Sequence, residues 1–454
     1  MEGLINKSLS LSSMTLIQEI IDQAKNNPDS IAIQGVDYVI SYKELLHVAY
    51  GYANSIDVRD SWIAIDTKLD WKFYAAILAC WITGNGYVPI DFNFPKSRIQ
   101  EIESQVNWLM LINEYTPCLT HEIVDVNSGE KAYLLFTSGT TGAPKGVAIS
   151  HANLASFASH YINHKSIKFG SEDIFLQSYD LTFDVSVFCY LMPFLVGGTL
   201  VIPPKSKVKQ LGLFNAILNY NVTVTSFVPS VIRLTKDFLT RIEFPSLKYS
   251  FFSGEALMGD WAKVWMQSVP NAKVYNCYGP TETVIVCTEE LLNDLDDAYF
   301  TNALPLPLGK EFEGIDLQII EGEIIFSGEQ TFHGYLNQTS IEQYHSGDLA
   351  HYDENGKLIF DGRKDNQIQW NGYRIELEEI DRLISDKSNG WVKSIYVKEI
   401  PKLVIFSNNP KEKIAELVEK EFPSYYKPSD IIQLDELPLN NNGKIDVVAL
   451  RDLI

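Results

Sequence analysis

The sequence predicts an α/β fold: a large N-terminal domain of helix-covered, largely parallel sheets with a small β-rich subdomain, followed by a small C-terminal α+β domain. Up to about residue 315, short apolar segments alternate with helical patterns of roughly 10 to 15 residues, which is typical of parallel sheets covered by helices. Beyond Asp316, short alternating strands separated by glycine turns replace that pattern. A chain of 454 residues is also too long for one simple core, so two or three domains are expected.

The N-terminal elements follow from the spacing of apolar residues. Residues 15–24 have helical spacing, 31–33 form a short apolar strand, and a helix is expected from Ser41. Ser41 and Glu44 have the spacing of a capping box, which favours a helix start there. The same criteria predict a helix at 71–82 and strands at 62–65, 87–90, 200–202, 222–227, 249–252 and 273–276.

The last third of the chain has a different pattern of predicted elements, with short strands that alternate apolar and polar residues. Strands are predicted at 317–320, 323–326 and 357–360, as in a small β-rich subdomain. The polar run 363–367 lies between apolar segments and is a candidate hinge. After it, helices are expected at 376–384 and 414–422, with strands at 394–397 and 403–406.

Composition and charge exclude several classes of protein. The apolar content of 46% and charged content of 21% are ordinary for a globular protein. The net charge of -21 argues against a nucleic-acid partner and against binding to an anionic membrane. The five cysteines are scattered without a CxxC pair, and the N-terminus has no signal-peptide pattern, so we expect a cytoplasmic protein. The longest apolar run, 187–196, is too short to span a bilayer.

One stretch, 134–147, points to phosphate binding. The apolar run 133–136 predicts a buried strand, and a loop rich in threonine, serine and glycine follows it. Its glycines allow backbone N–H groups to approach a ligand closely, and its hydroxyls and lysine suit a phosphate chain. It is not a Walker A loop, because Lys145 lies between Pro144 and Gly146. The alternative is a flexible surface turn. The candidate ligands are Thr137, Ser138, Gly139, Thr140, Thr141, Gly142 and Lys145.

A second stretch, Asn276-Cys277-Tyr278-Gly279-Pro280-Thr281-Glu282-Thr283, makes the pattern specific. Together with the loop at Thr137, the chain resembles the adenylate-forming superfamily of acyl-CoA synthetases, luciferases and amino-acid-adenylating domains of nonribosomal peptide synthesis. Within it, the chain is most similar to stand-alone amino-acid adenylation enzymes such as D-alanine:carrier-protein ligases. Further motifs match in the family's order, at 41–45, 83–91, 322–335, 346–349, 361–367, 371–377 and 442–446.

The resemblance implies that a substrate carboxylate attacks the α-phosphate of ATP to give an acyl-adenylate. The loop from Thr137 would hold the β- and γ-phosphates, and Glu282 would bind Mg²⁺, a cation that prefers carboxylate and phosphate oxygens. Lys444 would be the catalytic residue that bridges the carboxylate and the α-phosphate. The residues implied in ATP binding beyond the loop are Asn276, Tyr278, Gly279, Thr281, Asp348 and Arg363.

The resemblance also implies a domain boundary. Asp365 matches the family's hinge position, which divides the chain into an adenylation core, residues 1–364, and a mobile C-terminal domain, residues 365–454. Rotation at this hinge would let one active site perform adenylation and then thioester formation.

The segment 179–188 looks like the one that supplies the substrate pocket, in which Asp184 would pair with the α-ammonium of an amino acid. The alternative for Asp184 is a cap on the following helix. The other pocket positions lack a second charge and leave little space, which indicates a small neutral amino acid: alanine of either hand, serine, threonine or proline. They are Val185, Phe188, Ser226, Phe251, Ser253, Cys277, Ile285 and Val286.

The partner implied is a separate carrier protein with a phosphopantetheine arm, since this sequence has no Gly-Gly-x-Ser attachment site of its own. Two rival functions stay open: an acyl-CoA synthetase for a non-amino carboxylic acid, and a catalytically silent homologue that binds nucleotide. The pair His160 and His164 has metal-binding spacing but no zincin glutamate, so a solvated helix face is expected there. Gly197 and Gly198 are expected to mark a turn.

Overall fold

The structure is a computed structural model that describes residues 15–114, 126, 129–137, 144–204, 206, 208–301, 304–365, 367–370, 372–397, 400–439 and 445–454. Its contacts divide the chain into two compact units. The first unit comprises Met1–Ile90, Trp108–Leu135 and Val147–Gly362, and the second comprises Asp91–Asn107, Phe136–Gly146 and Arg363–Ile454.

A nine-stranded sheet is the main element of the first unit. Its order is β14-β13-β12-β11-β10-β8-β9-β1-β2. The six strands from β12 to β1 pair in parallel, and antiparallel strands close both edges. Their bounds are β1 (Ile31–Gln34), β2 (Val39–Ser41), β8 (Ile174–Leu176), β9 (Thr199–Val201), β10 (Val224–Phe227), β11 (Tyr249–Phe252), β12 (Lys273–Tyr278), β13 (Thr288–Leu291) and β14 (Lys310–Glu311).

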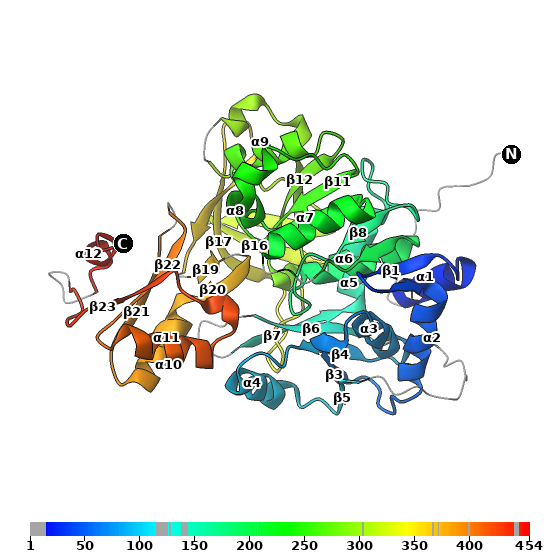
Figure 1. The fold of residues 1–454 in the computed structure, drawn as a ribbon, viewed down its shortest axis with the longest axis horizontal. Helices are drawn as coiled ribbons and strands as arrows, with labels where there is room; N and C mark the ends of the chain where they lie inside the picture. Colours follow the sequence, from blue (N-terminus) through cyan, green and yellow to red (C-terminus); the bar gives the residue numbers. More distant parts are fainter. Residues whose placement is uncertain are drawn as a thin grey trace. The chain divides into compact units, whose positions relative to one another are not determined.

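A second, five-stranded sheet has the order β5-β3-β4-β6-β7 and is parallel from β5 to β6. It is formed by β3 (Trp62–Asp66), β4 (Gly86–Ile90), β5 (Met110–Ile112), β6 (Lys131–Thr137) and β7 (Lys145–Ser150). Helix α3 (Lys72–Ile82) packs on β3 and β4 (Figure 1), and all but its first residue are buried. Apart from Lys72, every residue of α3 is therefore part of the core.

The other helices of the first unit cover these sheets. They are α1 (Thr15–Asn26), α2 (Tyr42–Ala53), α5 (His151–Ile162), α6 (Val185–Val196), α7 (Lys209–Tyr220), α8 (Ser230–Leu239) and α9 (Gly259–Ser268). The capping box predicted at Ser41 is present, with the Ser41 side chain accepting from the Glu44 N–H and the Glu44 carboxylate accepting from the Ser41 N–H. The expected turn at Gly197 is also confirmed, because Gly197 ends α6 with a φ of 75°.

The β-rich subdomain is confirmed as a four-stranded sheet of β15 (Ile315–Ile320), β16 (Glu323–Gly328), β17 (Tyr344–Tyr352) and β18 (Leu358–Arg363). Strand β16 pairs in antiparallel fashion with both β15 and β17. Antiparallel hairpins explain why the sequence alternates here instead of running in fully apolar blocks.

The described part of the second unit contains two small sheets and four α-helices. Strands β19 (Gln367–Trp370) and β20 (Tyr373–Glu376) form a hairpin, and β21 (Val392–Val397), β22 (Lys402–Ser407) and β23 (Asp430–Gln433) form a sheet. Helices α10 (Leu377–Ser388) and α11 (Lys411–Glu421) pack against that sheet (Figure 1). The remaining helices are α4 (Lys96–Val106) and α12 (Val447–Arg451).

A buried ion pair lies inside the second unit. Arg98 Nη1 lies 3.1 Å from Glu379 Oε1, and the Tyr426 hydroxyl donates to Glu379 Oε2 at 2.9 Å. Both charged side chains are almost fully buried, so removing either partner would leave an uncompensated charge.

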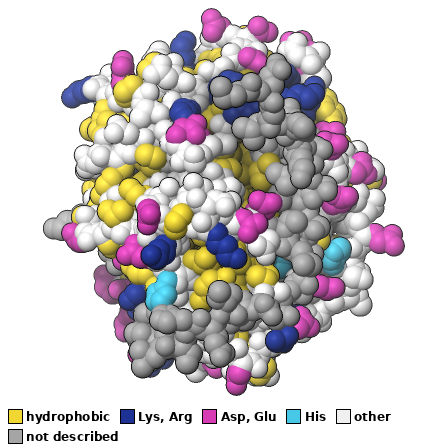
Figure 2. All heavy atoms as spheres, turned by 90° about the vertical axis from the view of Figure 1, so that its right-hand side faces the viewer, with side chains coloured by type: hydrophobic (Ala, Val, Ile, Leu, Met, Phe, Trp, Pro, Cys, Tyr) yellow, Lys and Arg dark blue, Asp and Glu magenta, His cyan; other side chains and the backbone are white. Residues whose placement is uncertain are grey.

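The surface carries both signs of charge. Acidic and basic side chains are interspersed over the face drawn in Figure 2, with apolar side chains between them. Among the described residues, no helix is long and apolar enough to cross a membrane.

Candidate active site

Tyr278 and Asp348 meet at the C-terminal end of β12, a strand of the nine-stranded sheet. Tyr278 is the last residue of β12, and its hydroxyl donates to Asp348 Oδ2, in the middle of β17, at 2.6 Å. Burial and the nearby carboxylate raise the pKa of Tyr278 well above its ordinary value, so the phenol stays a donor. The structure thus brings together two residues that are 70 positions apart and that the sequence assigned to one nucleotide.

The backbone around Asp348 is also fixed. The Ser346 hydroxyl donates to the Ile324 carbonyl at 2.7 Å and accepts from the Asp348 N–H at 3.0 Å. Glu323 accepts from the Gly347 N–H at 3.0 Å, where Gly347 has a φ of 72°. The Ser-Gly-Asp sequence therefore forms a bend within β17 that sets the position of the carboxylate.

Glu282 lies in a short 3₁₀ turn, Thr281–Thr283, directly after β12. Its side chain is fully buried, and the Tyr335 hydroxyl donates to Glu282 Oε1 at 2.7 Å. A buried carboxylate that accepts from a neutral hydroxyl fits the expectation of a cation ligand, because Mg²⁺ prefers carboxylate oxygens. Tyr335 was not among the predicted residues, although the sequence motif that ends at Tyr335 was recognised.

Gly279 and Asn276 have structural roles beside this turn. A Cβ on Gly279 would lie 2.6 Å from the Cα of Val286, so only glycine allows this close approach. The Asn276 amide donates to the Pro307 carbonyl at 2.7 Å. Thr281 opens the 3₁₀ turn. These three residues therefore shape the end of β12, where the prediction placed ATP.

The predicted phosphate loop is described only at its two ends. Thr137 is the last residue of β6, and Lys145 is the first residue of β7. A strand follows the loop, as the lack of a helix start had indicated. The predicted ligands Ser138, Gly139, Thr140, Thr141 and Gly142 lie outside the described residues.

The predicted substrate pocket consists of buried residues from the first unit. Phe188 and Phe251 contact each other edge to face, with ring centroids 5.4 Å apart, and Tyr161 packs against both rings. Tyr161 was missed because nothing in its local sequence marks it. The eight positions predicted after Asp184 are all buried: Val185, Phe188, Ser226, Phe251, Ser253, Cys277, Ile285 and Val286.

The polar groups of this pocket are few and neutral. The Ser253 hydroxyl is buried and has no hydrogen-bond partner among the described residues. A polar atom of a ligand could therefore form a hydrogen bond with it. Burial, assisted by Glu289, raises the pKa of the Cys277 thiol well above its ordinary value, so this thiol is neutral.

Asp184 shows the helix-cap geometry that the sequence left open. It is the N-cap residue of α6, and its Oδ1 accepts from the Val185 N–H at 2.7 Å. The carboxylate also lies near the Tyr133 hydroxyl. Burial, and to a smaller extent the charge of Asp184, raises the pKa of Tyr133 well above its ordinary value. A cap contact and a substrate contact use different lone pairs, so the two roles are compatible.

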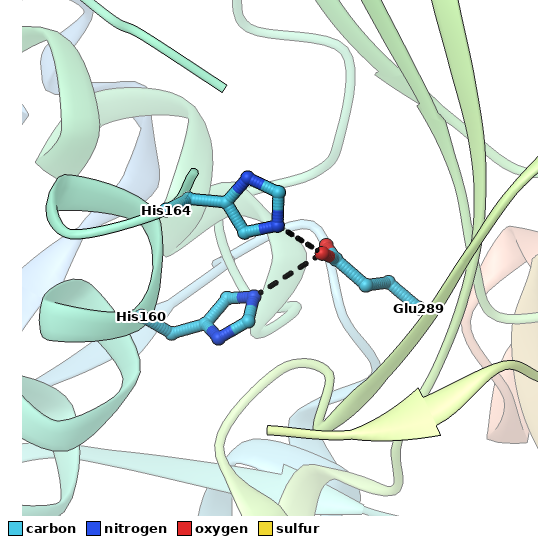
Figure 3. Close-up of side chains that lie close together, drawn as sticks. All are labelled: His160, His164 and Glu289. Atoms are coloured by element: carbon cyan, nitrogen blue, oxygen red, sulfur yellow. Dashed lines mark ion pairs between the residues drawn. The ribbon is translucent and has the colours of Figure 1, made fainter. Parts of the chain in front are cut away.

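The expected solvated face at His160 and His164 is wrong. Their side chains are only 16% and 17% exposed, and both rings point to Glu289 of β13 (Figure 3). His164 Nε2 lies 2.7 Å from Glu289 Oε1, and His160 Nε2 lies 3.4 Å from the same oxygen. Burial raises the pKa of Glu289, but the two histidines outweigh it and hold this pKa below its ordinary value.

These three side chains have the composition of a metal site, with ligand atoms within 4.8 Å of one another. The tautomer of His164 argues against that use. Its Nδ1 accepts from the Ser166 and Ile167 N–H groups at 3.1 and 2.9 Å, so the proton lies on Nε2 and donates to Glu289. A metal would have to displace that proton. We therefore interpret the cluster as an anchor for Glu289.

Glu289 is a charge that sequence reasoning placed nowhere near the pocket. It pairs directly with Cys277 in the β12–β13 ladder, so the two side chains lie on one face of the sheet. The predicted pocket positions themselves contain no second charge. The carboxylate of Glu289, however, lies beside Cys277.

In the second unit, Arg363 forms a two-point contact with Asp365. Its Nε and Nη2 donate to the two carboxylate oxygens at 2.8 and 2.7 Å. Burial raises the pKa of Asp365, but Arg363 outweighs it and lowers this pKa below its ordinary value. The predicted catalytic residue Lys444 lies outside the described residues.

A comparison with models of protein families identifies the family of this chain. The AMP-binding enzyme family matches residues 103–336, just over half of the chain. The chain belongs to the AMP-binding enzyme family, and the resemblance to adenylate-forming enzymes is confirmed.

Individual relatives cover nearly the whole chain. The D-alanine--D-alanyl carrier protein ligase of Lactococcus lactis subsp. lactis (strain IL1403) is 28% identical, over 96% of this chain and 98% of that protein. The Vibrio cholerae adenylation domain AlmE, solved with glycyl-adenosine-5'-phosphate, is similar with a TM-score of 0.84 and 24% identity, over 100% of this chain and 99% of that one. The Bacillus subtilis o-succinylbenzoate CoA synthetase gives a TM-score of 0.78 at 18% identity, over 96% and 98%. The two structures share the predicted α/β fold, which is thereby confirmed.

Proposed function

We propose that this enzyme activates a small neutral amino acid as an aminoacyl-adenylate and transfers it to the phosphopantetheine thiol of a separate carrier protein. The observation that carries the proposal is Asp184, a half-buried carboxylate next to an otherwise uncharged, buried set of predicted pocket residues. A partly buried carboxylate beside apolar side chains is stabilised by a cationic partner, and the α-ammonium of an amino acid would supply one. The near full-length similarity to a D-alanine carrier protein ligase supports the same class of substrate and partner.

For the nucleotide, the proposal uses the residues at the end of β12 and in β17. Asp348 would accept from the ribose hydroxyls while Tyr278, which donates to Asp348, presents its ring to adenine. Glu282 would hold Mg²⁺, which neutralises phosphate charge when bound. The loop from Thr137 to Lys145 would hold the phosphates.

The remaining predicted roles belong to the second unit. Arg363 would donate to the ribose or a phosphate, and Asp365 would be the hinge between a core of residues 1–364 and a C-terminal domain of residues 365–454. Lys444 would stabilise the charge that develops when the carboxylate attacks the α-phosphate. We place the reaction in the cytoplasm, as the scattered cysteines predict.

The substrate size follows from the aromatic pocket wall. Phe188, Phe251 and Tyr161 pack with centroids 5.3 to 5.8 Å apart, which fills the volume that a large side chain would need. Alanine of either hand, serine, threonine or proline would fit this wall, with Ser253 available to a polar atom.

Exchange of labelled pyrophosphate into ATP tests the proposal, across all proteinogenic amino acids, D-alanine and plain carboxylic acids. We expect strong exchange with one small neutral amino acid. Asp184→Asn should lower it about 100-fold, as expected when the substrate ammonium loses its charge partner. Asparagine keeps a side-chain oxygen for the Val185 N–H, so this variant separates substrate binding from helix capping.

The same assay decides between the rivals. The cap contact of Asp184 is the specific observation that favours an acyl-CoA synthetase, because a capping carboxylate needs no ammonium partner. Exchange only with plain acids, unaffected by Asp184→Asn, would establish that rival. Exchange with no substrate would favour a silent nucleotide-binding homologue. Asp180→Asn, at an exposed position of the same segment, is the matched control and should leave exchange unchanged.

A further inference from the structure

The loop after Glu282 has a backbone that its own residues disfavour. Val284 and Ile285 have φ angles of 58° and 71°, in the left-handed region. β-branched residues rarely adopt this conformation, because their Cβ substituents clash with the backbone. Such a loop persists only when surrounding contacts hold it.

One side chain contacts three carbonyl groups of this loop. Gln330 is buried, and its Nε2 donates to the carbonyls of Thr283 at 2.7 Å, Val284 at 3.1 Å and Val286 at 2.6 Å. An amide group has two hydrogens, so the three carbonyls share them. Gln330 therefore fixes the loop on both sides of Ile285.

The segment that carries Gln330 is itself held from another element. The Asn153 amide donates to the carbonyls of Glu329 and Thr331 at 2.8 and 3.1 Å. Asn153 belongs to the capping box that starts α5, where its side-chain oxygen accepts from the Ser150 N–H. The two residues flanking Gln330 are thus tied to a rigid helix start.

We infer that Gln330 is a positioning residue for substrate specificity: its amide holds the strained loop that places Ile285 and Val286 in the pocket wall. The inference rests on the proposed function, in which these two residues line the amino-acid pocket. Gln330 would act through the loop, without touching the substrate.

Loss of the Gln330 amide should change the shape of the proposed pocket. Without the donors, the left-handed residues lose their support, and the side chains of Ile285 and Val286 can shift. Pocket discrimination responds strongly to such shifts, since one methylene group changes specificity by roughly 10- to 200-fold.

The test compares Gln330→Met with Thr331→Val. Methionine keeps the length and volume of glutamine but has no donor. Thr331 is the matched control, because it is buried next to Gln330 and its hydroxyl has no hydrogen-bond partner among the described residues. We expect Gln330→Met to change the ratio of kcat/KM values for the preferred amino acid and a homologue one methylene larger by about tenfold. Thr331→Val should leave this ratio unchanged.

A second measurement does not depend on the substrate. Hydrogen exchange of the peptide covering 281–287 should speed up about tenfold in Gln330→Met and stay unchanged in Thr331→Val, because exchange follows local opening. An unchanged ratio together with unchanged exchange would overturn the inference, and so would equal effects of both variants. If Gln330→Met does not fold, Gln330→Asn carries the same comparison with a shorter amide. Absence of pyrophosphate exchange in the wild type would overturn the proposed function, while hydrogen exchange would still decide the role of Gln330.

Discussion

Residues 281–287, called the pocket loop after their proposed role, and residues 363–376, called the hinge segment because the proposed hinge Asp365 lies near their start, are held in opposite ways. Neutral donors hold the pocket loop: the Gln330 amide on three carbonyls and the Tyr335 hydroxyl on Glu282. Charged groups hold the hinge segment, where Arg363 binds Asp365 at two points. The hydrogen bonds from the neutral Gln330 amide to backbone carbonyls depend little on salt or pH, whereas partly exposed ion pairs depend on both.

The difference suits the proposed roles of the two regions. A pocket that discriminates by size needs a fixed wall, and fully buried contacts such as those of Gln330 and Glu282 provide one. A hinge needs contacts that can be exchanged at small cost, and exposed ion pairs contribute little net stability. Each prediction below perturbs one side of this comparison.

The largest effect is expected at Tyr335. Tyr335→Phe removes the donor that binds Glu282 and leaves a buried carboxylate with one hydrogen bond less, a loss of about 1.5–3 kcal/mol. We expect the Mg²⁺ concentration for half-maximal pyrophosphate exchange to rise about tenfold or more. Titration of Mg²⁺ at saturating ATP and amino acid measures this.

Tyr352→Phe is the control for that change, because Tyr352 is exposed on the neighbouring strand and should not alter the Mg²⁺ dependence. An unaltered Mg²⁺ dependence in Tyr335→Phe would remove Glu282 from the proposed metal site.

The contact between Tyr335 and Glu282 also shows what local sequence patterns leave unpredicted. Local patterns predicted the alternation of strands and helices, the capping box at Ser41, and the strand before the loop at Thr137, because these depend on near neighbours. Most of the helices between α3 and α10 were not predicted individually. The motif resemblance also selected Tyr278 and Asp348 as candidate nucleotide ligands. The direct contact between the two, across 70 residues, was not predicted.

What the sequence could not predict depends on contacts between distant segments. Glu289 binds histidines more than 120 positions earlier in the chain, and Gln330 reaches a loop 44 to 47 positions before it. The histidine spacing fitted a metal site, and the lack of a zincin glutamate led to the expectation of a solvated face. The third member of the cluster, Glu289, comes from a strand whose register only the assembled sheet determines. Gln330 carried no local signal at all.

The second prediction concerns Glu376 in the hinge segment. Burial, then the charge of Asp365, raises its pKa from 4.5 to about 7, while Arg374 opposes the shift. A carboxyl with a raised pKa in the folded state contributes stability that is complete below pH 4.5 and is lost as the pH rises through 7. Glu376→Gln should therefore remove part of the loss of stability that the wild type shows between pH 5 and pH 8.

Urea unfolding of both proteins at several pH values measures this difference, and other titrating groups cancel in the comparison. Glutamine keeps the oxygen that accepts from the Gln367 amide, so the hairpin contact survives. Parallel pH profiles for variant and wild type would show that Glu376 is ionised in the folded protein at pH 5 and would contradict the prediction. Once the intrinsic pH dependence of amide exchange is corrected for, the protection of the pocket loop should not follow the titration of Glu376.

The smallest effect is expected from salt on the Arg363–Asp365 pair. The pair is partly exposed, so screening should weaken it by less than about 1 kcal/mol between low and high salt. Hydrogen exchange of the peptide covering 363–370 should become faster with added NaCl, and that of 281–287 should not change. Asp365→Asn should abolish the salt response, whereas Asp361→Asn, at an exposed carboxylate paired with His351, should preserve it. Equal salt responses in both peptides would mean that charge does not distinguish the hinge segment from the pocket loop, because a general loosening of the fold would then account for both.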